Sequence, residues 1–339
     1  MITESNRKFW LEKETGSVLI IALWGIVLLA LFASSLAGGV RQKMVVFQRL
    51  EAKNQLRQIA EAGIKKAMAQ IRDHSREEPF NIKSLWNRDF LPFENVVIGR
   101  GNFSVFSRSS KKWVVSDESQ KVNINRSDVG TLKRLFQLRG HLGEEPAERL
   151  AYAIIDYRDS DDDLSAYFGN GSEEETYSSA GLPYKPKNRD FELISELLLV
   201  KEMDRDLYYQ IQDDITVYGS GKININTAPS ELLLLFDLDP QLVQKIDVLR
   251  NGKDGSEGTE DDFLFTNIAT IESELTSFFS ILSEPERISL NHAIVQNQLT
   301  VVSEYFSVVS EASMRNNQGH HQVSCIFATS GDVQYWVES

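Results

Sequence analysis

The chain is poor in the residues that build disulfide-bonded and catalytic sites. It has one cysteine, Cys325, among 339 residues, so an intramolecular disulfide is excluded and cysteine usage does not identify the compartment. The histidines stand apart from any Gly-x-Ser-x-Gly elbow, His-Glu-x-x-His helix or glycine-rich phosphate loop. They are His74, His141, His292, His320 and His321. The sequence therefore nominates no catalytic triad, zinc site or nucleotide site, and we do not expect an enzyme.

Positive charge is also scarce. The 36 Lys and Arg residues are outnumbered by 49 Asp and Glu residues, which gives a formal net charge of −13. A surface this acidic repels phosphate backbones, so a general nucleic-acid binder is disfavoured. Divalent cations are the charged partners that the composition favours.

One long hydrophobic run lies near the N-terminus. Ser17 to Val40 form 24 residues without a charge, and a helix of this length spans a hydrocarbon core of about 30 Å. A secretory signal peptide has a shorter apolar stretch of roughly 7–15 residues before its cleavage site. The run therefore predicts a transmembrane helix over residues 17–40.

The helical pattern continues beyond this run. Apolar side chains recur at three- and four-residue spacing with charged residues between them, at Leu56, Ala60, Ile64, Ala67 and Ile71. We expect one continuous helix that ends at about Asp73.

The segment before the run, residues 1–16, is polar and ends in Lys13-Glu14-Thr15-Gly16. With the continuous helix it resembles the leader and stem of type IV prepilins and pseudopilins; an ordinary signal anchor with a glycine at its edge is the alternative. The resemblance implies that a prepilin peptidase cuts after Gly16, leaving Ser17 as the methylated N-terminal residue. Ile21 would then be the fifth residue, where most members carry glutamate. An apolar residue there implies a subunit at the fibre tip, with no neighbour above it.

Short strands are predicted on both sides of a long helical region. Strands are expected at 102–107 and 112–116, and again at 299–309, 322–329 and 333–337. The simplest architecture is α+β, a pilin-like α/β domain with a small antiparallel sheet into which a large α-helical domain is inserted. We assign residues 41–120 to the stem and first strands, 121–292 to the inserted domain and 293–339 to the closing strands.

The inserted region contains an internal repeat. Lys121-Val122-Asn123-Ile124-Asn125 recurs at 222–226, each time before a leucine-rich helix, and Thr227 is the expected N-cap of the second helix. The motif also resembles the approach to helix-hairpin-helix modules, so a membrane-anchored DNA-uptake protein is a rival interpretation. No Gly-hydrophobic-Gly element follows either copy, and acidic residues follow where phosphates need amides and lysine.

Three further motifs carry the strongest resemblance. They are the segment from Ile155 to Asp163, the Gly171-Ser172-Glu173-Glu174-Glu175 stretch with Tyr177, and the run 183–189 before the Glu192–Val200 helix. In this order, and with the segment 221–228, they are similar to the general secretion pathway protein K family. Tyr157 stands where that family usually has tryptophan, and Ser172 where it has alanine.

This resemblance implies a minor pseudopilin of a bacterial type II secretion system. Such a protein is anchored once in the inner membrane, lies mostly in the periplasm, starts assembly at the tip of the pseudopilus and aids export of folded proteins. Its implied partners are the minor pseudopilins I, J and H, the major pseudopilin, the prepilin peptidase and the inner-membrane secretion platform.

Two acidic clusters predict calcium sites. Asp159, Asp161 and Asp163 alternate in one loop with Glu173 shortly after, and such loops supply the 6–8 oxygens that calcium takes. The second cluster lies among glycines that allow tight turns, at Asp254, Glu260, Asp261 and Asp262. The family is known to bind calcium; a solvated acidic loop is the alternative for both clusters.

A membrane-tethered hydrolase is the remaining alternative. Acidic pairs can serve as general acid and base, but the sequence offers no sign of the sugar-binding cleft that a glycosidase needs.

Overall fold

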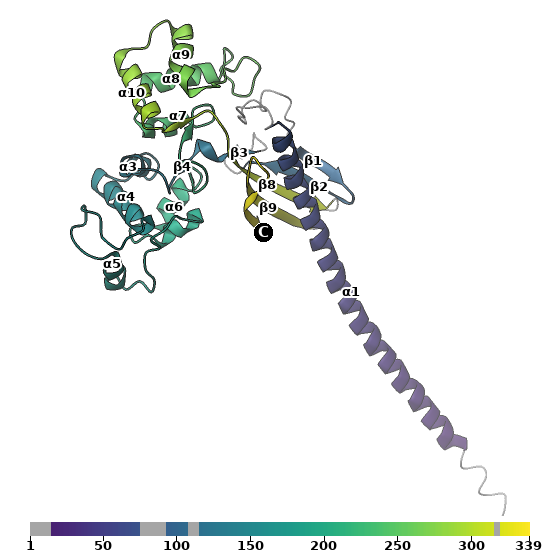
Figure 1. Cartoon of the computed structure of the whole chain (residues 1–339). Coiled ribbons are helices and arrows are strands. Elements are labelled where there is room, and N and C mark those ends of the chain that lie inside the picture. Colours follow the sequence, from purple (N-terminus) through teal and green to yellow (C-terminus); the bar gives the residue numbers. More distant parts are fainter. Residues whose placement is uncertain (1–14, 75–92, 108–114, 315–318) are drawn as a thin grey trace, which may run out of the picture. The chain divides into compact units, whose positions relative to one another are not determined.

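The computed structural model describes residues 15–74, 93–107, 115–314 and 319–339 (Figure 1). The chain divides into two compact units, residues 1–58 and residues 59–339. Most of the expected leader, residues 1–14, lies outside the described residues, as do residues 112–114 of one expected strand.

Helix α1 runs from Thr15 to His74, which confirms the prediction of one unbroken helix. Its first part has a mean hydropathy of 2.6 over its most apolar window, and none of that window is buried within the protein. The large side chains along it, such as Leu19 and Trp24, are exposed to the surroundings. The helix is therefore long and apolar enough to cross a membrane.

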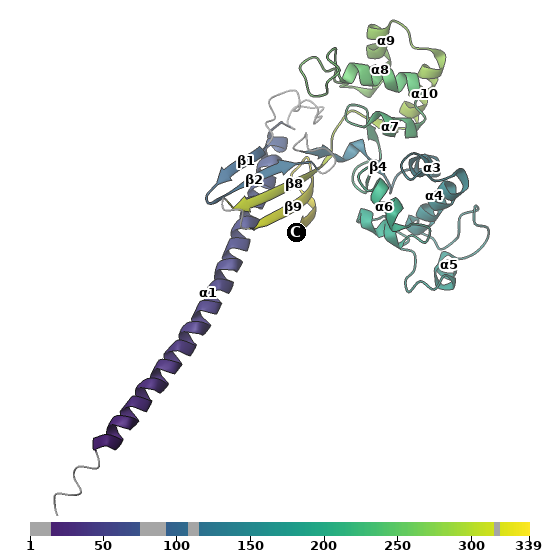
Figure 2. The ribbon, with the colours of Figure 1, turned by 180° about the vertical axis from the view of Figure 1, so that it is seen from behind.

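The sheet of the second unit is antiparallel, in the order β1-β2-β8-β9-β10, of which Figure 2 labels the first four strands. A short strand, β3, pairs with β8 beside this order. Alternate residues of β2 and β9 are buried, as expected for strands with one face on a core. The strands are β1 (Phe93–Ile98), β2 (Gly101–Phe106), β3 (Ser116–Asp117), β8 (Tyr305–Met314), β9 (His320–Ala328) and β10 (Val333–Glu338).

The last turns of α1 belong to the core of this unit. Ala60, Ile64, Ala67 and Ile71 are fully buried. At Gly63 the helix comes so close to the sheet that an added Cβ would clash with the Ser310 hydroxyl. Apolar residues at helical spacing thus place α1 on the sheet, and the predicted α+β, pilin-like class is confirmed.

The helices between β3 and β8 form two groups, labelled α3–α6 and α7–α10 in Figure 1. The first group comprises η1 (Glu118–Gln120), β4 (Val122–Asn123), α3 (Val129–Leu138), α4 (Glu144–Arg158), α5 (Glu173–Ser179), η2 (Ile194–Leu199), α6 (Arg205–Ile211) and β5 (Ile215–Thr216). The second comprises β6 (Ile223–Asn224), α7 (Ser230–Leu233), η3 (Leu234–Phe236), α8 (Pro240–Arg250), η4 (Ile268–Thr270), α9 (Ile271–Phe279), α10 (Glu284–Val295) and β7 (Leu299–Thr300). Each group closes with a two-residue parallel pair, β4 with β5 and β6 with β7.

The sequence repeat is also a structural repeat. Asn123 Oδ1 accepts the backbone N–H of Asn125 at 2.8 Å, and Asn224 Oδ1 accepts that of Asn226 at 3.0 Å. The Asn125 amide then exchanges two hydrogen bonds with the backbone of Phe191. The Asn226 amide does the same with Phe265. The side chains of the repeated asparagines are buried and hydrogen-bonded to backbone groups. They are therefore not available to contact DNA.

Two local predictions at the repeat and its return strand are wrong. Thr227 is not an N-cap, because Pro229 caps α7 and the Thr227 hydroxyl donates to Asp117 instead. Residues 299–309 do not form one strand, because Leu299–Thr300 pairs with β6 and β8 begins only at Tyr305. Ser303 lies in this break, and its hydroxyl donates to Asp117.

Two other expected elements differ in detail. The helix expected over Glu192–Val200 is a 3-10 helix over Ile194–Leu199, entered where Glu196 accepts the backbone N–H groups of residues 192 and 193. The strand expected over residues 112–116 is described only at its end, where Ser116 opens β3.

Candidate metal centre

The acidic group of the first loop is built at the ends of two helices. Asp156 lies in the last turn of α4, Asp159 is its C-cap, and Glu173 is the first residue of α5. The Ser172 hydroxyl caps α5 by accepting the backbone N–H of Glu175 at 3.3 Å. The two helix ends therefore bring the three carboxylates to one place.

One oxygen from each of Asp156, Asp159 and Glu173 lies within 4.8 Å of the others. Within the described ranges, these three carboxylates are the cluster of side chains that could hold a metal ion. Glu173 is 1% exposed and Asp156 is 5% exposed. Both carboxylate oxygens of Glu173 and Oδ1 of Asp159 are buried without a hydrogen-bond partner. Asp156 is held by Ser165, which donates from its hydroxyl and its backbone N–H.

The three carboxylates repel one another. Burial, together with the charges of Asp159 and Asp156, raises the pKa of Glu173 to about 8. Burial also raises the pKa of Asp159 to about 6, with Asp161 and Asp156 as the next causes. Buried anions without partners are costly, and a divalent cation removes that cost by coordinating their oxygens. The all-oxygen donor set fits a hard cation such as calcium.

Asn188 is hydrogen-bonded to the backbone of the segment that carries Asp156 and Asp159. Its backbone N–H donates to the carbonyl of Tyr157 at 3.0 Å, and its side-chain amide donates to the carbonyl of Asp161. Its Oδ1 is buried without a partner. The residue adopts a φ of 50°, a conformation that asparagine tolerates better than most side chains.

The structure brings together only part of the predicted first cluster. Asp159 and Glu173 meet, whereas Asp161 and Asp163 are exposed and outside the group of three. Asp161 Oδ1 instead accepts the backbone N–H of Asp163 at 3.0 Å. Sequence reasoning did not nominate Asp156, although its position three residues before Asp159 on a helix was a signal that the two side chains lie on one face.

The second predicted cluster is organised differently. Asp254, Asp261 and Asp262 converge on Thr259, whose Oγ1 lies 2.8 Å from Asp261 Oδ1 and 3.2 Å from Asp262 Oδ1. Asp261 Oδ2 also accepts the backbone N–H of Lys253 at 2.6 Å, and the Thr259 and backbone donors lower the pKa of Asp261. Glu260 is exposed and lies outside this arrangement. Hydrogen-bond donors within the loop already satisfy these carboxylates. This second loop therefore needs a cation less than the group of Asp156, Asp159 and Glu173 does.

An arginine anchors each acidic loop to its repeat. Arg158, the last residue of α4, donates to the carbonyls of Ile124 and Ser127. Arg250, the last residue of α8, donates to the carbonyls of Ile225 and Ala228. Each loop thus begins at a fixed point, which is a second sign of internal duplication.

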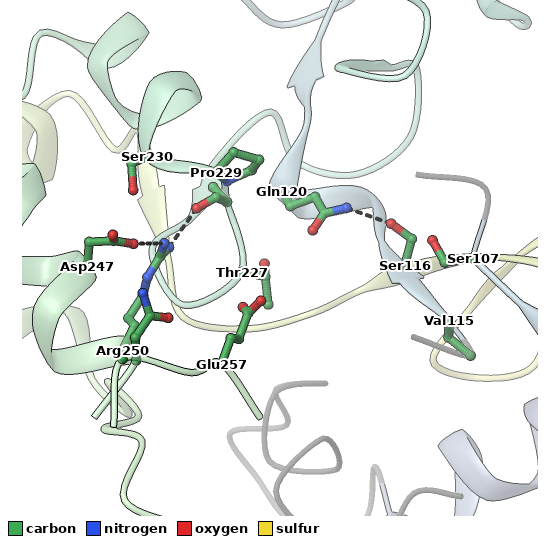
Figure 3. A pocket seen from close by; sticks show the side chains of 13 residues that line it. Ser107, Val115, Ser116, Gln120, Thr227, Pro229, Ser230, Asp247, Arg250 and Glu257 are labelled. Carbon is green, nitrogen blue, oxygen red and sulfur yellow. Dashed lines mark hydrogen bonds and ion pairs between the residues drawn. The ribbon is translucent and has the colours of Figure 1, made fainter. Parts of the chain in front are cut away.

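Arg250 also forms a wall of a polar cavity of about 420 Å³ (Figure 3). The Arg250 guanidinium lies 2.9 Å from the Asp247 carboxylate. On the other side of the cavity, the Gln120 side-chain amide donates a hydrogen bond to the Ser116 hydroxyl. The hydroxyl groups of Thr227 and Ser230 also line the cavity. Among the described residues, the lining holds no histidine or cysteine that could act as a nucleophile or base.

Asp117 lies at the point where the sheet meets both helical groups. It is fully buried, and its Oδ2 accepts hydrogen bonds of 2.8 Å from Asn224, Thr227 and Ser303. Burial raises its pKa, and the hydrogen bonds oppose that rise. The next residue, Glu118, accepts from Thr216 and pairs with Lys121, so two adjacent acids hold the two helical groups.

Comparisons with known proteins agree with this architecture. The family model described as type II secretion system (T2SS), protein K, matches residues 79–220. The type II secretion system protein K of Pseudomonas aeruginosa is 24% identical over 235 residues, which are 67% of this chain and 68% of that relative. The protein of the same description from Pectobacterium carotovorum subsp. carotovorum is 36% identical over 91 residues, 26% of this chain and 27% of the relative.

A solved structure has the same fold. One chain in the crystal structure of the GspK-GspI-GspJ complex from the type II secretion system of enterotoxigenic Escherichia coli superimposes with a TM-score of 0.63. The match covers 86% of this chain and 98% of that chain at 16% identity.

Proposed function

We propose that this chain is a minor pseudopilin of the type II secretion system protein K family and that it caps the tip of the periplasmic pseudopilus. In that position it starts fibre assembly and aids export of folded proteins across the outer membrane. The observation that carries the proposal is a pilin-like helix and sheet that bear a two-part helical insertion between β3 and β8. The protein acts by assembly rather than by catalysis.

The partners follow from the same family. The matched solved structure is a complex of GspK with GspI and GspJ, and we extend that assembly to this chain. The minor pseudopilin H, the major pseudopilin, the prepilin peptidase and the inner-membrane platform complete the proposed set. The N-terminal apolar helix is a single-pass anchor. Its membrane is the bacterial inner membrane, with the bulk of the chain in the periplasm.

Calcium is proposed as the structural cofactor of the first loop. Asp156, Asp159 and Glu173 would hold it, with the Asn188 oxygen as a fourth candidate. The bound ion supplies positive charge that offsets the repulsion among the carboxylates. It thereby ties the end of α4 to the start of α5. The second loop, at Asp254 and residues 260–262, is a secondary candidate.

Processing is expected between Gly16 and Ser17. The mature N-terminus should therefore be Ser17, and intact mass measurement of the chain from cells that process other prepilins checks this. Gly16→Leu should block cleavage, because the peptidase of this family cuts after glycine. Gly25→Leu is the matched control, since the helix has open space at Gly25. An intact Met1 in the wild type, or cleavage beyond Val40, would contradict the assignment.

The fifth mature residue, Ile21, is expected to tolerate only apolar replacements. Ile21 is 68% exposed on α1, in the apolar segment, and an unpaired carboxylate within a bilayer costs several kcal/mol by general estimates. A tip subunit has no neighbour above it whose N-terminal amine could pair with that charge. Ile21→Glu should lower insertion or recovery with partner subunits, whereas Ile21→Leu should be silent. Equal recovery of both variants would show that the missing carboxylate does not define the tip position.

A further inference from the structure

Strand β10 ends the sheet with an open main-chain edge. It pairs with β9 on one side, and no described strand pairs with its other side. The backbones of Ser339 and Gln322 exchange two hydrogen bonds, of 2.9 and 3.0 Å. Because such pairs alternate in an antiparallel ladder, the N–H and C=O groups of Trp336 and Glu338 point away from β9. These groups form a template for one further strand.

The opposite edge of the sheet is protected against pairing. Strand β1 has a register shift between Phe93 and Val96, and Asn95 within it has a φ of 50°. Irregularities of this kind twist an edge away from incoming strands. Strand β10 has a register shift of its own between Val333 and Tyr335, but its register is regular from Tyr335 to Glu338. It also lacks the proline and lysine that commonly guard edges.

The side chains beside the β10 edge form an apolar surface. Val333 is 47% exposed and Val337 is 41% exposed. Tyr335 shares a face with Val337 and lines a groove of about 160 Å³ that separates the sheet from η2, whereas Val333 lies before a register shift, opposite Phe327. Leu193, 41% exposed, lines the same groove. An added strand would place alternate side chains against this surface.

The charges near the edge are acidic. Asp332 precedes β10, Glu338 ends it, and Asp213 lines the groove with an exposed carboxylate. Lys121, which also lines the groove, is paired with Glu118 at 2.6 Å. A complementary strand therefore carries a lysine or arginine among alternating apolar residues.

We propose that β10 is the docking edge for an extended segment of a neighbouring pseudopilin, an alternating apolar strand with at least one basic side chain. The identity of the partner rests on the proposed function, whereas the edge and its chemistry follow from the sheet. Main-chain hydrogen bonds give this contact its affinity, and the groove beside Tyr335 selects a side chain.

The test uses the full chain purified in detergent with the minor pseudopilins I and J. Hydrogen exchange at the amides of Trp336 and Glu338 should slow in the complex, because those N–H groups gain acceptors. Val337→Lys should lower the affinity for the partner subunits by about tenfold or more. The new lysine would lie opposite a partner strand that is apolar and carries a basic side chain. Val97→Lys, on the other edge strand and 58% exposed in the wild type, is the matched control and should have no effect.

Three results would overturn the proposal. The complex could form with unchanged exchange at both amides, or Val337→Lys could bind as well as the wild type. Protection that rises with the concentration of the chain alone would mean that a second copy occupies the edge. A wild-type chain that fails to bind I and J altogether would instead contradict the proposed function.

Discussion

Asp117→Ala is expected to destabilise the unit formed by residues 59–339 by roughly 3–5 kcal/mol. The substitution leaves three buried donors, on Asn224, Thr227 and Ser303, without the oxygen that accepts them at 2.8 Å. Burying a donor without a partner costs about 1–3 kcal/mol each, and the Asn224 amide also donates to the Ser303 hydroxyl over a longer distance of 3.3 Å. Denaturant unfolding followed by circular dichroism measures the effect.

The control for this loss is Asp213→Ala. Asp213 is an exposed aspartate in the same unit, so its removal should change stability by at most about 0.5 kcal/mol. Limited proteolysis should also show that Asp117→Ala loosens the helical groups from the sheet. Equal stability of Asp117→Ala and the wild type would mean that the buried carboxylate does not hold this junction.

Calcium is expected to raise the stability of the same unit, and Glu173→Gln to remove that response. At a free calcium concentration a hundredfold above Kd, mass action adds about 2.7 kcal/mol, or roughly 5–10 °C in Tm. Without calcium, at a pH above 8 where the Glu173 carboxyl is ionised, Glu173→Gln should be at least as stable as the wild type, because it removes a buried charge that repels Asp159 and Asp156. Scanning calorimetry with and without calcium measures both effects.

The pH dependence of the calcium-free protein has a definite sign. The pKa of Glu173 is about 8 in the folded chain against an ordinary value of 4.5, so the folded state binds the proton more tightly than the unfolded state does. Its contribution to stability is therefore present below pH 4.5 and is lost as the pH rises through 8. Calcium should cancel this trend by favouring the ionised carboxylates.

Glu175→Gln is the matched control for this site. Glu175 is exposed on the same helix, and its substitution should leave the calcium response intact. A Tm that neither calcium nor a chelating resin changes would remove the metal proposal. A variant Glu173→Gln that still responds as the wild type would place the ion elsewhere, with the second loop as the next candidate.

Local patterns were sufficient for much of the fold. The apolar first part of α1, its last turns and the strands β2, β9 and β10 follow from apolar spacing, which depends only on near neighbours, whereas β1 was not predicted. The repeat around Asn123 and Asn224 was also visible, because the same residues make the same turn twice. These features require no knowledge of distant contacts.

Features that depend on distant contacts were missed. Ser303, in the break between β7 and β8, donates to Asp117, which lies 186 residues earlier in the chain. The metal candidate shifted from Asp161 and Asp163 to Asp156 because a helix end, and not the run of aspartates, decides which carboxylates face Glu173. A charge run shows where acidic residues are dense, but burial selects the ones that need a cation.

The most direct test of the account is co-purification of the full chain with the minor pseudopilins I and J from detergent-solubilised membranes. We predict that the processed chain, beginning at Ser17, elutes with both partners in one complex. Recovery of I and J together without this chain, when all three are produced and membrane-inserted, would contradict its assignment as their tip subunit.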